Sequence, residues 1–292
     1  MPDKQHSLNL SAGLASVAVA LVLVLLKAWA LNATGALSIA ASLADSAMDM
    51  IVSALGLFAI FYAARPADED HAFGHTSVED LISLGQAIFI TLSAGLIAVS
   101  ALRRLFLETP PALAEQTAGI LVMATSILLT SALILWQRRV AARTGNKVVA
   151  ADSLHYIGDL LPALGAILAL QLSTHFDATW VDSLIALLGA AFMLRGAVKI
   201  GVASWHALMD RQADADVIDG IKAIARNWPG VHGFHDLKTR TAGSRVFVHL
   251  HIELDGAQTL REAHDIGAAL KREIIKAYPQ ADVIIHKDVA AT

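Results

Sequence analysis

Two pairs of ionisable side chains interrupt long apolar stretches of the chain. Asp45 and Asp49 are four residues apart in one stretch, and His155 and Asp159 are four residues apart in another. On a helix, this spacing places both members of a pair on one face. Ionisable groups at membrane depth are costly, and they usually mark a path for ions or substrate. Together, one imidazole and three carboxylates form a ligand set that suits a divalent metal ion.

The absence of cysteine narrows the choice of metal. None of the 292 residues is a cysteine, so there are no disulfides and any bound metal is held by nitrogen and oxygen. Such ligands fit zinc, ferrous iron, manganese or cobalt better than cuprous copper, and the imidazole of His155 favours zinc and cadmium. The alternative is that the four groups form interhelical polar contacts or a proton relay without metal.

A polar loop carries a second candidate site. Asp68, His71 and His75 form a three-ligand set that would leave one position of a zinc ion open. The alternative is a solvated acidic loop whose histidines bind nothing.

The end of the chain carries a third candidate, because it is unusually rich in histidine. The candidate ligands are His235, His251, His264, His286 and Asp288. The alternative is that these are ordinary surface histidines.

The elements that must position these groups are membrane helices. Hydrophobic residues make up 55% of the chain, and six apolar stretches approach or exceed the roughly 20 residues needed to cross a bilayer. We place these spans at 8–31, 36–63, 78–105, 112–140, 148–171 and 178–203. The first stretch has no clean cleavage site, so we interpret it as a retained helix and not as a signal peptide.

Lysine and arginine set the expected orientation. The cluster Arg138, Arg139, Arg143 and Lys147 falls on one side of an alternating six-helix path. Because cytoplasmic loops are enriched in these residues, both termini are predicted to lie in the cytoplasm. Both ionisable pairs then fall near the middle of the membrane, on helices that run in opposite directions.

From residue 209 onward the composition is that of a small soluble domain. A helix at 214–228, strands at 235–241 and 245–254, a helix at 259–278 and a strand at 281–286 are expected. This αββαβ order predicts an open α+β sandwich, so we divide the chain into a transmembrane domain, 1–208, and a cytoplasmic domain, 209–292. The formal net charge of −4 gives no reason to expect nucleic acid as a partner.

Six motifs make nearly the whole chain resemble the cation diffusion facilitator family, close to its bacterial zinc and ferrous-iron efflux exporters. They are AxxxDSxxD at Ala41–Asp49, RPADxxHxFGH at Arg65–His75, ADxxHYxxD at Ala151–Asp159, LMDR at Leu208–Arg211, GxHDLxTR at Gly233–Arg240 and DVIIHxD at Asp282–Asp288.

The resemblance implies a homodimer with six membrane helices per protomer and a metallochaperone-like cytoplasmic domain. It assigns the Asp45, Asp49, His155 and Asp159 set to transport and the Asp68 set to a loop site. It also implies a two-metal site at the cytoplasmic dimer interface, with Asp288 as the bridge.

Two positions depart from the family pattern. Close relatives have a lysine at the position of Ser77, which pairs with the acid matching Asp210. Ser77 does not supply that charge, so other partners are expected for Asp210. Lys287 stands between two predicted ligands, where its charge is expected to weaken the two-metal site.

The resemblance implies a proton-coupled antiporter that exports divalent cations from the cytoplasm by alternating access. Zn²⁺ is the favoured ion, and Cd²⁺, Fe²⁺, Co²⁺ and Mn²⁺ are also accepted. The expected location is the inner membrane of a bacterial cell. The alternative is a membrane metal sensor or scaffold that binds metal without moving it. An enzyme is not expected, because the sequence offers no nucleophile or phosphate loop.

Overall fold

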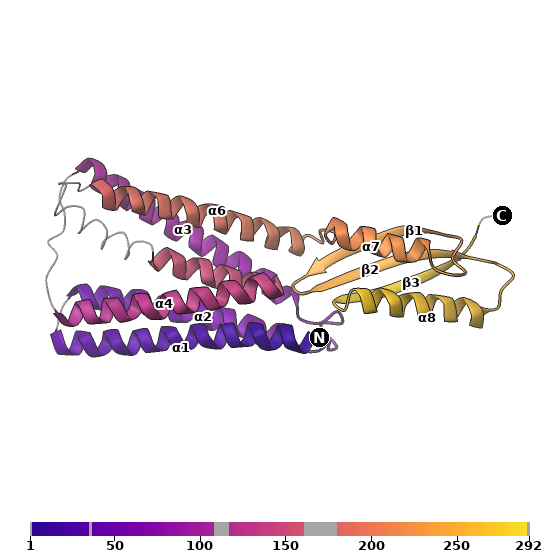
Figure 1. The fold of residues 1–292 in the computed structure, drawn as a ribbon, viewed down its shortest axis with the longest axis horizontal. Coiled ribbons are helices and arrows are strands. Elements are labelled where there is room, and N and C mark those ends of the chain that lie inside the picture. The colour runs from indigo at the N-terminus through magenta and orange to yellow at the C-terminus, as the bar shows by residue number, and fades with distance from the viewer. Residues whose placement is uncertain (1, 35–36, 108–116, 161–179, 291–292) are drawn as a thin grey trace. The chain divides into compact units, whose positions relative to one another are not determined.

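The structure is a computed structural model that describes residues 2–34, 37–107, 117–160 and 180–290. The chain divides into two compact units, one of Gln5–Ser204 and one of Trp205–Thr292 with Met1–Lys4 (Figure 1). The division into functional domains at residue 208 stays a prediction.

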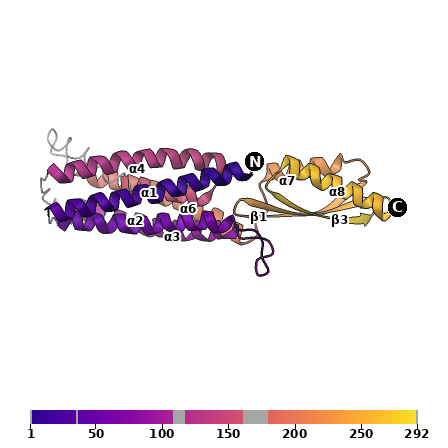
Figure 2. The same cartoon turned by 90° about the horizontal axis from the view of Figure 1, so that it is seen from below.

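The larger unit is a bundle of long helices that run side by side (Figures 1 and 2). Its labelled helices are α1 (Pro2–Thr34), α2 (Leu37–Ala63), α3 (Ser77–Leu107), α4 (Thr117–Thr144) and α6 (Trp180–Leu208). Residues 147–160 form the described part of one further helix. Residues 161–171 of the span predicted there lie outside the described residues.

Four helices contain a stretch that is long and apolar enough to cross a membrane, counted over the described parts of the chain. These stretches are Gln5–Asn32, Asp45–Ala63, Ser77–Arg103 and Ala186–Leu208. Large apolar side chains on these helices, such as Leu92 and Leu96 of α3, point away from the bundle interior. Such side chains suit contact with lipid, which is as apolar as leucine.

The helix at 147–160 packs against both halves of the bundle. Its Ala151 and Leu154 share a buried apolar cluster with residues of α3 and α6. Its Val149 and Tyr156 belong to clusters formed with α1, α2 and α4. The helix that carries His155 and Asp159 is therefore positioned from two sides.

Two glycines bring this helix close to α6. A Cβ atom at Gly158 would lie 2.1 Å from Cε of Met193, and one at Gly196 would lie 2.6 Å from Cδ2 of Leu154. A larger residue at either position would require Met193 or Leu154 to move, and small residues are common where membrane helices approach closely.

The smaller unit is a three-stranded sheet with two helices on one face. Its elements are α7 (Ala215–Arg226), β1 (Gly233–Ala242), β2 (Arg245–Leu254), α8 (Leu260–Ala277) and β3 (Ala281–Val289). The strand order is β1-β2-β3, with β2 antiparallel to β1 and parallel to β3. This is the αββαβ order that the sequence predicts.

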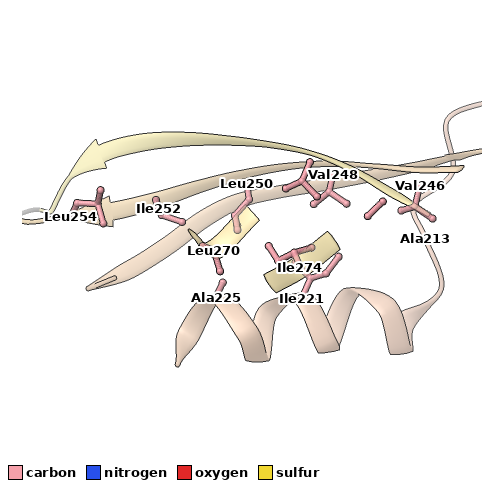
Figure 3. Packing of buried hydrophobic residues seen from close by; sticks show 12 residues of the cluster. Ala213, Ile221, Ala225, Val246, Val248, Leu250, Ile252, Leu254, Leu270 and Ile274 are labelled. Atoms are coloured by element: carbon pink, nitrogen blue, oxygen red, sulfur yellow. The ribbon is translucent and has the colours of Figure 1, made fainter. Parts of the chain in front are cut away.

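The core of this unit lies between the sheet and the helices (Figure 3). Val248, Leu250 and Ile252 alternate along β2 and are almost fully buried. They pack against Ile221 of α7 and Leu270 of α8. The opposite face of the sheet carries the intervening side chains, which include most of the histidines.

Strand β3 is longer than the sequence predicts. The prediction ends it at His286, whereas its parallel pairing with β2 continues to Val289, which pairs with Leu254. The extension places Asp288 inside the sheet, paired with Glu253.

Candidate metal centres

The first centre lies between α2 and the helix at 147–160. Nε2 of His155 is 3.0 Å from Oδ1 of Asp49 and 3.7 Å from Oδ2 of Asp159. One ligand atom from each of the three residues lies within 4.8 Å of the others. We call Asp49, His155 and Asp159 the transport group, after the role that the family resemblance implies for them. An imidazole with two carboxylates around one point could hold a metal ion through three ligands and leave one position open.

Asp45, the fourth predicted ligand, is not part of this group. It is exposed, one turn before Asp49 on α2. The side chain of Ser46 accepts a hydrogen bond from Nζ of Lys27 at 2.6 Å, and the carbonyl of Ser42 accepts a second at 3.2 Å. A lysine from α1 therefore lies against this end of α2.

The second centre is the loop between α2 and α3. Oδ1 of Asp68 is 3.2 Å from Nδ1 of His71, and its Oδ2 is 3.2 Å from Nε2 of His75. The backbone N–H of His71 donates to Asp68 at 2.7 Å, and this bond contributes most to lowering the pKa of the Asp68 carboxyl. The carboxylate is held ionised between two imidazoles, as a metal ligand must be. The structure therefore brings the three predicted loop residues together.

The third centre lies on the open face of the cytoplasmic sheet. Oδ2 of Asp288 is 2.9 Å from Nδ1 of His251 and 3.4 Å from Nε2 of His235. Its other oxygen, Oδ1, is 3.2 Å from Nε2 of His286. The two oxygens of one carboxylate thus face different imidazoles, which is the arrangement that a bridging ligand requires.

Strand register explains this convergence. His251 on the central strand pairs with His235 on one side and with His286 on the other. Asp288 lies two residues beyond His286 on the same face. The hydrogen bond with His251 is the main cause that lowers the pKa of the Asp288 carboxyl.

His264 does not join this centre within one protomer. It is exposed on α8, and α8 covers the opposite face of the sheet. Glu253, which the sequence analysis did not select, does approach it: Oε1 of Glu253 is 2.9 Å from Nδ1 of His235. Glu253 lies two residues after His251 on the same strand, so its side chain is on the same face of the sheet, and this spacing could have identified it from the sequence.

The side chain of Lys287, whose charge is expected to weaken the cytoplasmic site, lies away from the predicted ligands, and its effect on metal binding stays a prediction. Cε of Lys287 would be 2.6 Å from a Cβ atom at Gly267, a buried residue of α8. Lys287 therefore lies on the helix-covered face, while His286 and Asp288 lie on the other. Alternation along a strand separates the charge from the ligands.

Asp210 has a charged partner within its own protomer. Nη1 of Arg240 donates to Oδ1 of Asp210 at 3.2 Å, and the Arg240 guanidinium also lies 4.3 Å from the ring centre of Phe247. Ser77 is exposed at the start of α3. A contact between Asp210 and the partner protomer stays a prediction.

Two family models match consecutive parts of the chain. The cation efflux transmembrane domain matches residues 13–209, and the cytoplasmic domain of cation efflux proteins matches residues 213–289. The chain therefore belongs to the cation efflux, or cation diffusion facilitator, family. This is a family of membrane transporters and not of enzymes. The predicted family and the predicted fold class are confirmed.

Particular relatives align over nearly the full chain. The cation-efflux pump FieF of Shewanella oneidensis is 43% identical over 277 residues, which cover 95% of this chain and 93% of the relative. FieF of Pectobacterium carotovorum subsp. carotovorum is 39% identical over 277 residues, covering 95% and 91%. The solved metal-bound C-terminal domain of the CzcD transporter from Thermotoga maritima is 29% identical, with a TM-score of 0.26 and coverage of 26% of this chain and 91% of that domain.

Proposed function

We propose that the protein exports divalent metal cations from the cytoplasm in exchange for protons, with Zn²⁺ as the favoured substrate and Cd²⁺ or Fe²⁺ as further substrates. The proposal rests on the position of the transport group within the long helices of the larger unit. Relatives named as cation-efflux pumps, similar over nearly the whole chain, support the direction of transport.

The ligand types support reversible binding of a borderline metal. One imidazole favours zinc over harder ions, and two carboxylates supply the charge that compensates a dication. Asp45 lies outside the group, so the fourth position is left for water or for Asp45 after a movement of α2. An incomplete site suits a carrier because the ion must leave as well as bind.

Proton exchange follows from the same ligands. Metal binding requires ionised carboxylates and a neutral imidazole, so it releases protons. When the metal leaves, acids that share a site of low dielectric repel each other and take up protons again. These titrations are coupled, and the protons belong to the group and not to one residue. Access from each side in turn would couple metal export to proton entry.

The cytoplasmic domain is proposed to join two protomers through metal. Asp288 would bridge two ions held by His235, His251 and His286, and His264 would come from the other side of the dimer interface. Metal that binds only the joined form stabilises it by mass action. We place the protein in the inner membrane with both termini in the cytoplasm.

A metal sensor or scaffold is the second candidate function. Two of the three centres, the loop and the open sheet face, lie outside the membrane helices and have exposed ligands. That distribution is compatible with a protein that reports metal without moving it.

Flux measurements separate the two candidates. Purified protein in liposomes is expected to move Zn²⁺ against its gradient when a proton gradient is imposed, and to stop when the proton gradient is collapsed. A panel of Zn²⁺, Cd²⁺, Fe²⁺, Co²⁺ and Mn²⁺ then ranks the substrates. Metal binding with no flux of any ion would reject the exporter in favour of the sensor.

A further inference from the structure

A second buried polar group lies next to the transport group. Asp152 is 4% exposed and accepts hydrogen bonds from Oγ of Ser16 at 2.5 Å and from Nε2 of Gln137 at 2.6 Å. Oγ of Ser53 donates to its other oxygen at 3.4 Å. These donors come from α1, α4 and α2, and all three are neutral. Among the described residues, no cationic side chain contacts Asp152, although this carboxylate is buried inside the larger unit.

The hydroxyls around Asp152 form a continuous chain. Oγ of Ser53 is 2.8 Å from Oγ of Ser16 and 2.9 Å from Oη of Tyr156. Each hydroxyl has one hydrogen to donate and lone pairs to accept. Ser16 and Ser53 can each donate their one hydrogen to the carboxylate, and Oη of Tyr156 can donate to Ser53.

A small cavity adjoins the carboxylate. Its volume is about 10 Å³, which is close to the minimum for one water molecule, and Asp152, Gln137 and Gly56 are among the residues that line it. Oε1 of Gln137 is buried without a hydrogen-bond partner among the described residues. The two amide atoms of Gln86, which is 6% exposed, are also buried without a hydrogen-bond partner among the described residues. Nε2 of Gln86 would lie 3.3 Å from a Cβ atom placed on Gly56. A water in this cavity would have the Asp152 carboxylate and Oε1 of Gln137 as polar partners.

The titratable neighbours of Asp152 are few. Among the described residues, the side chains of α1, α2 and α4 that hydrogen-bond to Asp152 are the neutral donors named above. Its own helix contributes Tyr156, reached through a serine, and His155, three residues further on, whose charge acts on the carboxylate through space. The metal site and Asp152 are thus electrostatically linked, although Asp152 is not among the metal ligands.

We propose that Asp152 is a proton-binding site separate from the metal ligands, on the side of the transport group nearer the junction of α2 and α3. This rests on the proposed function. Metal arriving one turn away brings positive charge that favours the ionised carboxylate. The O–H bond of the carboxyl breaks, and the proton passes to the cavity water and leaves as hydronium. When the metal departs, a proton returns to the carboxylate by the reverse path.

The test is the number of protons released when Zn²⁺ binds. Calorimetric titration of the full-length protein in two buffers of different ionisation enthalpy gives that number. Asp152→Asn keeps the shape and the acceptor oxygen but removes the proton site. We expect it to release about one proton fewer per Zn²⁺ than the wild type, with Zn²⁺ affinity changed by less than about tenfold. Protons released at the other two metal centres are the same in both proteins, so they cancel when the proton numbers of the wild type and Asp152→Asn are subtracted.

Asp80→Asn is the matched control. Asp80 is also fully buried in the bundle, but Nζ of Lys147 already pairs with it at 2.7 Å. This variant is expected to release as many protons as the wild type. Equal release by the wild type and Asp152→Asn would overturn the proposal.

A double variant guards against misfolding of Asp152→Asn. Ser16→Ala with Ser53→Ala keeps the carboxylate and removes two of its donors, which changes the balance between its charged and neutral forms. We expect the pH at which this proton is released to shift by about half a unit or more. An unchanged pH profile in the double variant would also reject the site. Because the readout is binding, it decides this proposal even if the wild-type protein transports nothing, a result that would reject the proposed function instead.

Discussion

The unequal positions of Asp49 and Asp45 lead to a direct test of the transport group. Oδ1 of Asp49 is 3.0 Å from Nε2 of His155, whereas Asp45 contributes no atom to the group. Asp49→Ala therefore removes one of three ligand atoms, and Asp45→Ala removes none. Loss of a partner that only orients a ligand lowers metal affinity about 10–100-fold. Loss of a ligand should exceed that range, so we expect at least about 100-fold weaker Zn²⁺ binding for Asp49→Ala and at most about tenfold for Asp45→Ala.

Both variants are compared by calorimetric Zn²⁺ titration and by Zn²⁺ flux into liposomes. Circular dichroism and the elution volume on gel filtration verify that each variant is folded and has the oligomeric state of the wild type. The pair is matched because both substitutions remove one carboxylate from the same helix. Equal losses of affinity would mean that both aspartates bind the ion, and the three-residue description of the site would then be refuted.

Three further changes test the rest of the molecule. His155→Asp should retain metal binding, shift the pH dependence of flux and relax the preference towards Mn²⁺, because it replaces nitrogen with oxygen; superimposable pH profiles and unchanged Zn²⁺ preference would contradict this. His251→Ala with His286→Ala should abolish Zn²⁺-dependent compaction of the cytoplasmic domain, read by small-angle scattering, while binding at the transport group is kept. Hydrogen bonds from Thr259 lower the pKa of the Glu262 carboxyl, so their stabilisation is present above the unfolded pKa of about 4.3 and is lost as pH falls through the lower folded value. Thr259→Ala should destabilise the domain by about 1 kcal/mol at neutral pH. The difference in thermal unfolding temperature between Thr259→Ala and the wild type should be smaller at about pH 3 than at neutral pH.

The geometry of the transport group could be predicted only in part from helical spacing. Residues four apart share a face, but they are also about 6 Å apart along the axis at 1.5 Å per residue. An imidazole is long enough to bridge that rise, and His155 reaches Asp159 at 3.7 Å. Two short aspartate side chains have less reach, so Asp45 and Asp49 share a face without meeting at one point. Side-chain length, and not spacing alone, decides which groups converge.

In the cytoplasmic sheet, alternation is the more reliable guide. Alternation along β2 puts Val248, Leu250 and Ile252 on the buried face and His251 and Glu253 on the open face. Lys287 is a sequence neighbour of His286 and Asp288 but not a spatial neighbour of their side chains. The same alternation that pairs His286 with Asp288 sends Lys287 to the other side. The cross-strand register, which brings His235 into the centre, depends on strand pairing that no local pattern encodes.

Asp152 lies within the ADxxHYxxD motif, yet its role could not be inferred from sequence. Its three neutral donors come from positions 16, 53 and 137, which are remote from it and from one another in the chain. A buried carboxylate beside a metal ligand could equally have been a fourth ligand. Only the packing of four helices shows that it faces hydroxyls and an amide instead of the metal.

The helix at 147–160 makes buried hydrogen bonds on one side and mainly apolar contacts on the other. This difference suggests how the transport group could open first to one side of the membrane and then to the other. Towards α1, α2 and α4 it is fixed by the buried hydrogen bonds of Asp152, which would be costly to break in a low dielectric. Towards α6 it contacts Met193 at Gly158, a pairing of an adaptable thioether with a residue that has no side chain. This side also has the contact of Leu154 with Gly196 and a hydrogen bond of 3.4 Å from Nζ of Lys147 to the carbonyl of Ala203, but over the described residues it has fewer buried hydrogen bonds to break. At its start, the helix is held to α3 by the ion pair of Lys147 with Asp80. Alternate access by a movement of this helix with α1, α2 and α4 against α6 would keep the ligands together while changing which side they face.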